Sequence, residues 1–436
     1  MNMHRIKTSA ADSNAGTMRK GATVAVLAVA GVLRLVWVLC IPVAPISDSW
    51  AYDVLARNLA RGMGYGWHPG HPTATWPVGP SFLYSVFYRV FGFVYAPIVI
   101  FNIVISLVTI LLGMKLAERW FNSKVALLAG ILLALWPVQI EFASVLGSEL
   151  IFNVLVLCWL AILELTEWNG WLKLIAAGVV AGLTCYVRPV ALLIPAALCI
   201  REVILYRRIV RPVASMAVVY LVMAAVIAPW SIRNTRDFGH FFLVSTNGRE
   251  NLWEGNNPAG NGETEALPPE VQHMGEGQRE IYLGKIAEAY IRQHPFLFAG
   301  RTVKKAFLLY DRESIGVYWN QPSILRLYGN RAFWILKIVS DLYWGAALLL
   351  GLWGAVLVFA RERVIAAVMS LPILLWLYFT GVYSTTVVQD RYHFAAIPFI
   401  AVLAALALQC FGDRFLTRRE PQSAEVRMRQ TVVSRS

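Results

Sequence analysis

The sequence has few charged residues, and acidic ones are especially scarce. Only 15% of its 436 residues are charged, with 26 Asp and Glu against 39 Lys and Arg, whereas 58% are hydrophobic. This balance excludes an ordinary soluble domain and indicates a membrane protein. The net charge of +13 follows the positions of basic residues between apolar runs, so we interpret it as an anchoring pattern and expect no nucleic-acid partner.

Cysteine is also scarce. The chain has five cysteines, an odd number, and all lie in apolar runs, where cysteine behaves as a small hydrophobic residue: Cys40, Cys158, Cys185, Cys199 and Cys410. This excludes a disulfide framework and the usual zinc-binding spacings. His68 and His71 form a His-x-x-His pair, but two histidines alone are weak evidence for a metal. We expect no metal and no cofactor.

Long apolar runs, by contrast, recur throughout the chain. Each is long enough to approach or cross a hydrocarbon core of about 30 Å. Lipid cannot satisfy open backbone groups, so such runs are expected to be helices. The predicted spans are residues 21–41, 95–114, 125–138, 150–165, 172–187, 191–205, 213–230, 338–359, 365–381 and 394–411. The sequence therefore predicts an all-α polytopic membrane protein of about ten transmembrane helices.

The basic residues predict the orientation of this bundle, because short cytoplasmic loops collect Lys and Arg. Clusters precede the first span and follow the second, sixth and eighth. Both termini are then cytoplasmic, as basic tails over residues 1–20 and 412–436. The extracytoplasmic segments are chiefly a first outer loop, 42–94, and a long loop, 231–337. The first outer loop belongs to a catalytic transmembrane core over 21–230, and the long loop separates this core from C-terminal transmembrane helices over 338–411. The first span, with internal Arg34 and no clean cleavage site, is predicted to be an uncleaved anchor.

The two outer segments contain amphipathic patterns of their own. In the first, residues 50–60 have apolar residues at helical spacing, glycines follow over 61–66, and a second amphipathic pattern begins at 76–80. We predict two interfacial helices. In the long loop we predict a helix near 279–293 and a basic amphipathic one over 294–310.

A series of motifs in the outer loops and at helix ends resembles a known family. They are Asp48 with Tyr52, Gly62–Tyr65, Pro77–Pro80, Ser148-Glu149, Arg188-Pro189, Arg233-Asn234 and Arg391-Tyr392. In this order they resemble the bacterial membrane glycosyltransferases of the GT-C fold, family 39 type, which include protein O-mannosyltransferases and the lipid A aminoarabinose transferase. One departure is Ser49, because many relatives have a second acid directly after the loop aspartate.

The resemblance implies a GT-C bundle in the bacterial inner membrane, with its site on the extracytoplasmic side. The implied reaction is an inverting transfer of a sugar from a polyprenyl-phosphate donor to an envelope glycolipid, polysaccharide or protein. Asp48 would be the catalytic base, since an acceptor hydroxyl must lose a proton. Arg188, Arg391 and Arg233 would bind the donor phosphate, because guanidinium groups fork onto phosphate oxygens. Glu149 and Tyr52 are the other predicted substrate-binding residues.

Each of these residues has a simpler interpretation. Asp48 at the start of a helix is a potential N-cap, Glu149 a first-turn acid favoured by the helix dipole, and the arginines are potential snorkelling side chains. For Arg34 we favour pairing with an acid over substrate contact.

The whole protein also has alternatives to an enzyme. One is a transporter or flippase of a lipid-linked glycan, although the sequence lacks the paired repeats typical of transporters. The other is a non-catalytic scaffold for envelope assembly.

Overall fold

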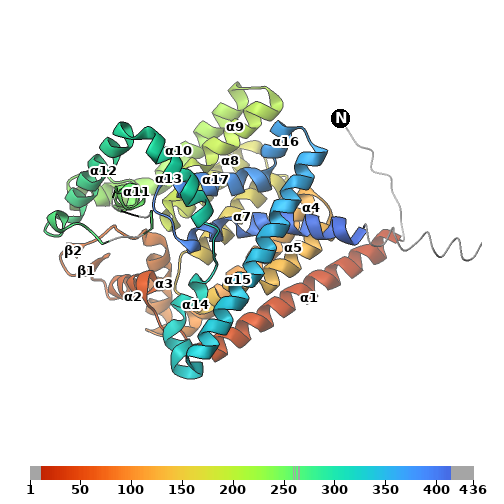
Figure 1. The fold of residues 1–436 in the computed structure, drawn as a ribbon, viewed down its shortest axis with the longest axis horizontal. Coiled ribbons are helices and arrows are strands. Elements are labelled where there is room, and N and C mark those ends of the chain that lie inside the picture. The colour runs from red at the N-terminus through yellow and green to blue at the C-terminus, as the bar shows by residue number, and fades with distance from the viewer. Residues whose placement is uncertain (1–10, 259, 261, 264–265, 414–436) are drawn as a thin grey trace, which may run out of the picture.

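The computed structural model describes residues 11–258, 260, 262–263 and 266–413 (Figure 1). Within them the chain is almost entirely helical, with a single two-stranded antiparallel hairpin, β1 (Gly66–His68) and β2 (His71–Pro72). The predicted all-α membrane architecture is confirmed. The predicted basic tails, 1–20 and 412–436, lie largely outside the described residues, since positions 1–10 and 414–436 are not described. Residues 11–20 of the first predicted tail belong to the helix α1, which begins at Ala11.

Seven helical segments of the described chain are long and apolar enough to cross a membrane. They are α1 (Ala11–Cys40) from Lys20 onward, α4 (Ala96–Trp120), α8 (Gly170–Val187), Pro189–Tyr206, which joins η2 (Pro189–Leu193) to α9 (Ile194–Tyr206), α10 (Val210–Phe238), α15 (Gln321–Arg361) and Asp390–Asp413, which begins with η4 (Asp390–Ala396). An eighth is the bent pair of α5 (Ser123–Leu135) with α6 (Pro137–Glu141) and η1 (Phe142–Ser144). The predicted number of about ten is not confirmed.

The shorter apolar helices account for much of the difference in number. Two predicted spans correspond to α7 (Glu149–Leu165), of 17 residues, and α17 (Leu371–Thr385), of 15, which follows the short α16 (Val364–Val368). A helix of 15 residues rises about 22 Å, which is less than the hydrocarbon thickness. Apolar composition identified these helices correctly, but it did not fix how many of them cross the membrane alone.

Two long helices extend beyond the spans predicted from hydropathy. Residues 231–238, placed in the outer loop by the sequence, continue α10 until Gly239 ends it in a left-handed conformation (φ 69°). Residues 321–337, also placed in that loop, already belong to α15, which is broken only at Gly329 (φ 75°). Hydropathy marks the part of a helix that suits lipid, whereas the helix itself ends where a residue leaves helical geometry.

Arg34 is buried inside the bundle, but no acid pairs with it among the described residues. Its guanidinium donates to Ser106 Oγ (2.6 Å) and to the carbonyls of Ala134 (3.1 Å) and Leu133 (3.3 Å). These carbonyls lie in the last turn of α5, and Pro137, which would follow in that helix, has no N–H to donate. The predicted pairing with an acid is wrong, because the bend supplies carbonyl acceptors instead.

The outer part of the molecule is built from both outer segments. The first contains the two predicted helices, α2 (Ser47–Ala60) and α3 (Val78–Phe91), which pack together. A Cβ on Gly79 would lie 2.6 Å from the Tyr186 carbonyl, so glycine allows α3 to approach the end of α8. The second contains α11 (Gly248–Asn256), η3 (Pro269–Val271), α12 (Glu276–Gln293), α13 (Pro295–Leu308) and α14 (Ile315–Trp319). Here α12 and α13 correspond to the predicted helices.

Glu276 joins the two outer segments. Its carboxylate accepts hydrogen bonds from Thr73 Oγ1 (2.7 Å) and Ala74 N (2.7 Å) of the first segment, and from Thr246 of the second. The hairpin and the helices α2, α11 and α12 consequently lie on the same side of the bundle (Figure 1). This outer layer covers the helix ends at which most of the predicted site residues lie.

Candidate functional site

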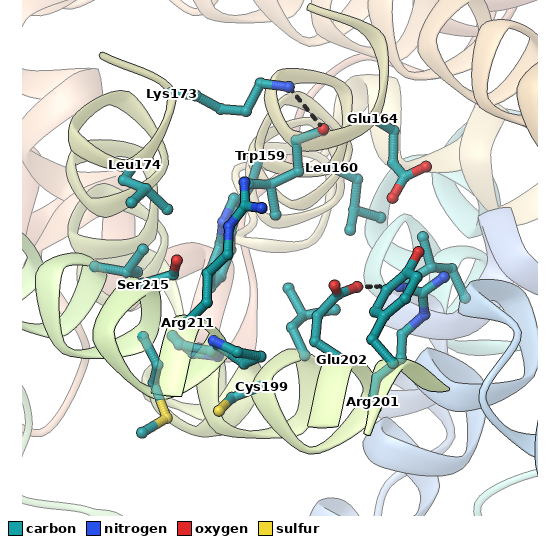
Figure 2. A pocket seen from close by; sticks show the side chains of 18 of the residues that line it. Trp159, Leu160, Glu164, Lys173, Leu174, Cys199, Arg201, Glu202, Arg211 and Ser215 are labelled. Carbon is teal, nitrogen blue, oxygen red and sulfur yellow. Dashed lines mark hydrogen bonds and ion pairs between the residues drawn. The ribbon is translucent and has the colours of Figure 1, made fainter. Parts of the chain in front are cut away.

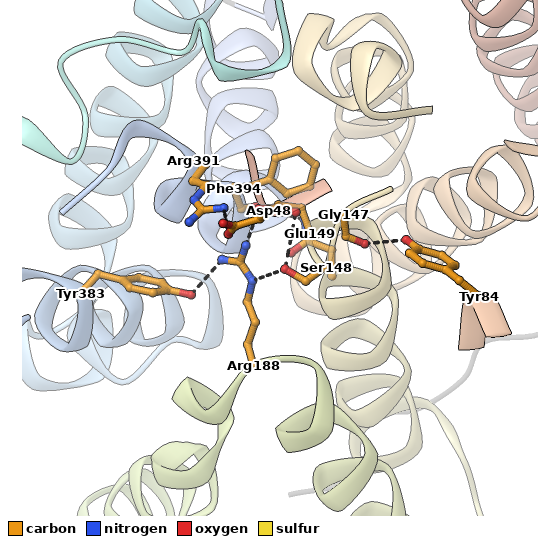
Figure 3. A network of polar contacts seen from close by, with 10 residues as sticks. Asp48, Tyr84, Gly147, Ser148, Glu149, Arg188, Tyr383, Arg391 and Phe394 are labelled. Carbon is orange, nitrogen blue, oxygen red and sulfur yellow. Dashed lines mark hydrogen bonds and ion pairs between the residues drawn. The ribbon is translucent and has the colours of Figure 1, made fainter. Parts of the chain in front are cut away.

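A cavity of about 410 Å³ lies between the outer layer and the helix ends. Its wall is formed by the start of α2, the junction of α8 with η2, the start of α11 and the segment between α17 and η4. Four of the six predicted site residues line it: Asp48, Tyr52, Arg188 and Arg391. Figure 3 shows Asp48, Arg188 and Arg391, which come from three distant parts of the sequence, gathered in one place.

Asp48 occupies the first turn of α2 and faces Arg391. The N-cap of α2 is Ile46, and no side chain caps the helix, so the N-cap interpretation of Asp48 does not describe this structure. Its carboxylate instead accepts a hydrogen bond from Arg391 Nη1. Burial by itself raises the pKa of Asp48, but the charge and hydrogen bond of Arg391 and a hydrogen bond from Trp76 outweigh it and lower the pKa. Asp48 is thus an ionised carboxylate at neutral pH.

Arg188 is held by three partners at the end of α8. It donates to Ser148 Oγ from Nε (2.9 Å), to Tyr383 Oη from Nη1 (3.2 Å) and to Glu149 from Nη2. Glu149 starts α7 and is only 1% exposed. It is not part of the cavity lining and lies beside Ser148, next to the Arg188 guanidinium (Figure 3). Glu149 therefore fixes the position and charge of Arg188.

Arg391 has a different environment. Its guanidinium lies over the rings of Trp319 (5.1 Å) and Tyr392 (5.2 Å), and Tyr392 in turn stacks on Tyr383. One of its donors, Nε, is buried and has no partner within the described chain. Because Arg391 uses only Nη1 on Asp48, it retains hydrogen-bonding capacity for an anion in the cavity.

The remaining two predicted residues differ in their placement. Tyr52 lines the cavity with 4% exposure, and burial, with the charges of Asp48 and Glu149, raises the pKa of its hydroxyl. Arg233, like Glu149, is not part of the cavity lining. It donates to the carbonyls of Thr73 and Tyr65 (both 2.8 Å) and pairs with Asp237 (2.7 Å). Its contacts hold the hairpin, and a substrate role for it stays a prediction.

The sequence analysis missed the wall contributed by α11 and its surroundings. Polar cavity residues from this wall are Ser245, Asn247, Glu250, Asn251 and Glu254. The wall is held by hydrogen bonds from Val387 N to Asn251 O (2.9 Å) and from Lys305 Nζ to Gly255 O and Thr386 O (both 2.8 Å). A Cβ at Gly255 would overlap the Thr386 carbonyl. The Gly/Asn-rich composition of 245–257 was visible in the sequence, but its position beside Asp48 was not.

The described residues contain no group of three or more His, Cys, Asp or Glu side chains suited to a metal ion. His68 and His71 lie in the hairpin with ring centroids 6.3 Å apart and outside the cavity lining. What the cavity does offer is the ionised carboxylate of Asp48, the carboxyl groups of Glu250 and Glu254 on the α11 wall, two guanidinium groups and several aromatic rings. This set can remove a proton from a hydroxyl while cations bind an anionic leaving group.

Known proteins resemble this chain in part of its sequence and in its overall fold. Residues 71–232, well under half of the chain, match a family model described as dolichyl-phosphate-mannose-protein mannosyltransferase. No curated protein sequence gives a significant match.

Among solved structures, the oligosaccharyltransferase AglB from Archaeoglobus fulgidus, in complex with an inhibitory peptide and a dolichol-phosphate, superposes with a TM-score of 0.57 at 14% identity, covering 92% of this chain and 52% of AglB. An Archaeoglobus fulgidus oligosaccharyltransferase in the apo form gives a TM-score of 0.56 at 13% identity and the same coverage. The chain thus spans about half the length of these archaeal proteins. ArnT from Cupriavidus metallidurans, bound to undecaprenyl phosphate, gives a TM-score of 0.43 at 16% identity, covering 88% of this chain and 77% of ArnT.

Proposed function

We propose that this chain, which has the predicted GT-C fold of membrane glycosyltransferases, transfers a sugar from a polyprenyl-phosphate donor to an acceptor hydroxyl. The observation that carries the proposal is the ionised Asp48 facing a 410 Å³ cavity beside Arg391. The volume lies within the range typical of small-molecule sites. The family match over residues 71–232 supports the same class of reaction.

In the proposed reaction, the acceptor oxygen attacks the anomeric carbon as Asp48 takes its proton. The bond between the anomeric carbon and the phosphate oxygen breaks, and the lipid phosphate leaves with the electron pair. The configuration at the anomeric carbon inverts. Because phosphate is already a good leaving group, no second carboxyl has to protonate it, in contrast to the glycosidases. The single cavity aspartate with Ser49 beside it is sufficient for this chemistry.

Arg391 has two tasks in this proposal. Without donor it binds the Asp48 carboxylate, which keeps the pKa of that group low and makes it a weak base. A donor phosphate that binds the unused donors of Arg391 would compete for its positive charge, so Asp48 would become a better proton acceptor when the substrate is present. Arg188 would supply a second fixed positive charge, since Glu149, Ser148 and Tyr383 restrict its position.

We propose a bacterial inner-membrane location with both termini in the cytoplasm and the cavity outside. The basic residues near Tyr206 support this orientation. Cysteines introduced separately at Gly260 and Tyr206 test it in intact cells with a membrane-impermeant thiol reagent. Labelling is expected at position 260 and not at 206, whereas the reverse pattern would place the cavity in the cytoplasm and remove the proposed acceptors from reach.

The acceptor is proposed to be an envelope glycolipid, polysaccharide or protein. Comparing envelope glycans of cells with and without this protein should reveal one missing sugar, and the molecule that lacks it is the acceptor. Purified protein in liposomes, given that acceptor and a labelled polyprenyl-phosphate sugar, should then move the label to the acceptor. If the labelled donor crosses the bilayer with its sugar–phosphate bond intact and no acceptor is labelled, the protein is a flippase and not a transferase.

A further inference from the structure

A second, larger cavity of about 730 Å³ lies between α7, α8, α9 and α10 (Figure 2). It is at the other end of the bundle from the site around Asp48. Glu149 begins α7 at that site, whereas Glu164 lines this cavity near the end of the same helix. Glu164 lies 15 positions after Glu149, which corresponds to about 22 Å of helix. The proposed transfer reaction uses nothing in this cavity.

Its walls combine apolar side chains with an excess of cations. Trp159, Leu160, Leu174 and Leu198 supply apolar surface. Its charged lining residues are Glu164, Lys173, Arg201, Glu202, Arg208 and Arg211, which give four positive and two negative charges. An amphiphile with an anionic head would match both properties.

Two of these cations have no partner within the described chain. Arg201 is bound by Glu202 (2.6 Å) and the Met369 carbonyl (2.9 Å), and Lys173 donates to the Leu163 carbonyl (3.2 Å). Arg208 and Arg211 take part in no comparable contact, and Figure 2 shows the Arg211 side chain extending into the middle of the cavity.

The position of Arg211 gives a further reason to expect an anion. It lies in the first turn of α10, and no acidic residue occupies that turn. The positive end of a helix dipole disfavours a cation there and favours an anion. A bound phosphate between Arg208 and Arg211 would remove this unfavourable arrangement. Glu164 on the opposite helix repels an anion, which keeps the expected phosphate position on the α10 side.

The same end of the bundle has the marks of a membrane interface. Large aromatic side chains are exposed there, with Trp168 at 48%, Trp171 at 67% and Tyr206 at 62%, and Ile209 and Val210 are exposed beside Arg208. Tryptophan and tyrosine concentrate at the head-group level of bilayers. Basic pockets between transmembrane helices at this level bind anionic lipid head groups.

We infer that this cavity binds a phosphate-bearing membrane lipid, with the phosphate between Arg208 and Arg211 and the chains against Trp159, Leu160 and Leu198. The ligand chemistry is a lipid phosphate, which either an anionic phospholipid or a polyprenyl phosphate supplies. The site is separate from the one that contains Asp48.

The test is a binding titration of the purified full-length protein in neutral detergent. The probes are phosphatidylglycerol, polyprenyl monophosphate, diacylglycerol and sodium phosphate. The variant R208Q/R211Q is compared with R207Q, which removes an adjacent arginine that does not line the cavity. We expect the double variant to bind phosphatidylglycerol at least about tenfold more weakly and R207Q to bind it as the parent does. E164Q should bind it more tightly, because a repulsive charge is removed.

Tighter binding of polyprenyl monophosphate than of phosphatidylglycerol, lost in the same double variant, would support the site and identify the carrier lipid as its ligand. Equal weakening by R207Q would reduce the effect to general surface charge and overturn the inference. Diacylglycerol bound as tightly as phosphatidylglycerol, or sodium phosphate displacing the lipid at equal concentration, would also overturn it. Because binding is measured without sugar transfer, the outcome does not depend on the proposed function.

Discussion

At the start of α2, Asp48 meets Arg391 at the edge of the cavity, whereas at the start of α7, Glu149 meets Arg188 behind it. The Asp48 side chain is 22% exposed and the Glu149 side chain 0%. Arg391 has a donor without a partner, while Arg188 donates from all three nitrogens. These two carboxylate–arginine pairs are thus suited to different roles. The open pair, Asp48 with Arg391, can exchange partners with a substrate, whereas the closed pair, Glu149 with Arg188, holds a positive charge in a fixed position.

The strongest test of the closed pair is Glu149→Gln. It leaves the Arg188 guanidinium buried without its counter-charge, and breaking such a pair costs about 3 to 5 kcal/mol. Thermal unfolding in detergent should show a large loss of stability. The matched control is Glu263→Gln, since Glu263 pairs with Arg312 at the surface, with both side chains at least 40% exposed, and such pairs contribute about 0 to 1 kcal/mol. Equal melting of both variants would mean that Glu149 has no fixing role.

The open pair is tested by Asp48→Asn, which keeps the shape but removes the base. Transfer should fall by at least about 10², because general-base catalysis contributes about 10² to 10⁴. The melting temperature should change little compared with Glu149→Gln, and donor binding should persist. Steady-state rates and donor titrations measure both. Near-normal transfer by this variant would assign the base to another residue.

The variants Arg391→Lys and Arg188→Lys distinguish the proposed roles of the two arginines. Lysine keeps the charge but loses the planar fork, and a charge-assisted contact is worth about 1.5 to 3 kcal/mol. Arg391→Lys should therefore weaken binding of both the lipid-phosphate sugar and the sugar-free lipid phosphate about ten- to a hundredfold. Arg188→Lys should weaken it less and lower the melting temperature more. Unchanged affinities in Arg391→Lys would contradict a phosphate site at this residue.

The smallest effect concerns pH. The folded-state pKa of Asp48 lies below its ordinary value because Arg391 and Trp76 favour the carboxylate. Its contribution to stability is therefore present above the unfolded pKa of about 3.9 and is lost only as pH falls through the lower folded value. The kcat/KM of sugar transfer should therefore show no decrease from protonation of a carboxylate between pH 7 and 5. A loss of rate centred near pH 6 would indicate a base with a raised pKa and would exclude Asp48.

Much of the fold was predictable because lipid imposes a simple rule on the sequence. The apolar runs located nearly all of the buried helices, and the amphipathic patterns located α2, α3, α12 and α13. The C-terminal end of α10 (residues 231–238) and the start of α15 (residues 321–337) were not predictable. Their sequences are polar enough to suggest a loop, but these residues are helical in the structure. The partners of Arg34 were missed for a related reason. Besides Ser106 Oγ, its acceptors include the carbonyls of Leu133 and Ala134 at the bend before Pro137, which no side-chain pattern encodes.

The sequence by itself determined that this is a polytopic helical membrane protein, and it pointed to five residues that the structure brings together, Asp48, Tyr52, Glu149, Arg188 and Arg391. Only the tertiary structure decided their pairing. Asp48 and Arg391 are 343 residues apart, and Arg233, which the same motifs favoured, turns to the hairpin instead. Charge and hydropathy along a chain report which side chains tolerate lipid or water. Which of them become neighbours depends on how helices cross and on where close approaches such as those at Gly79 and Gly255 are possible.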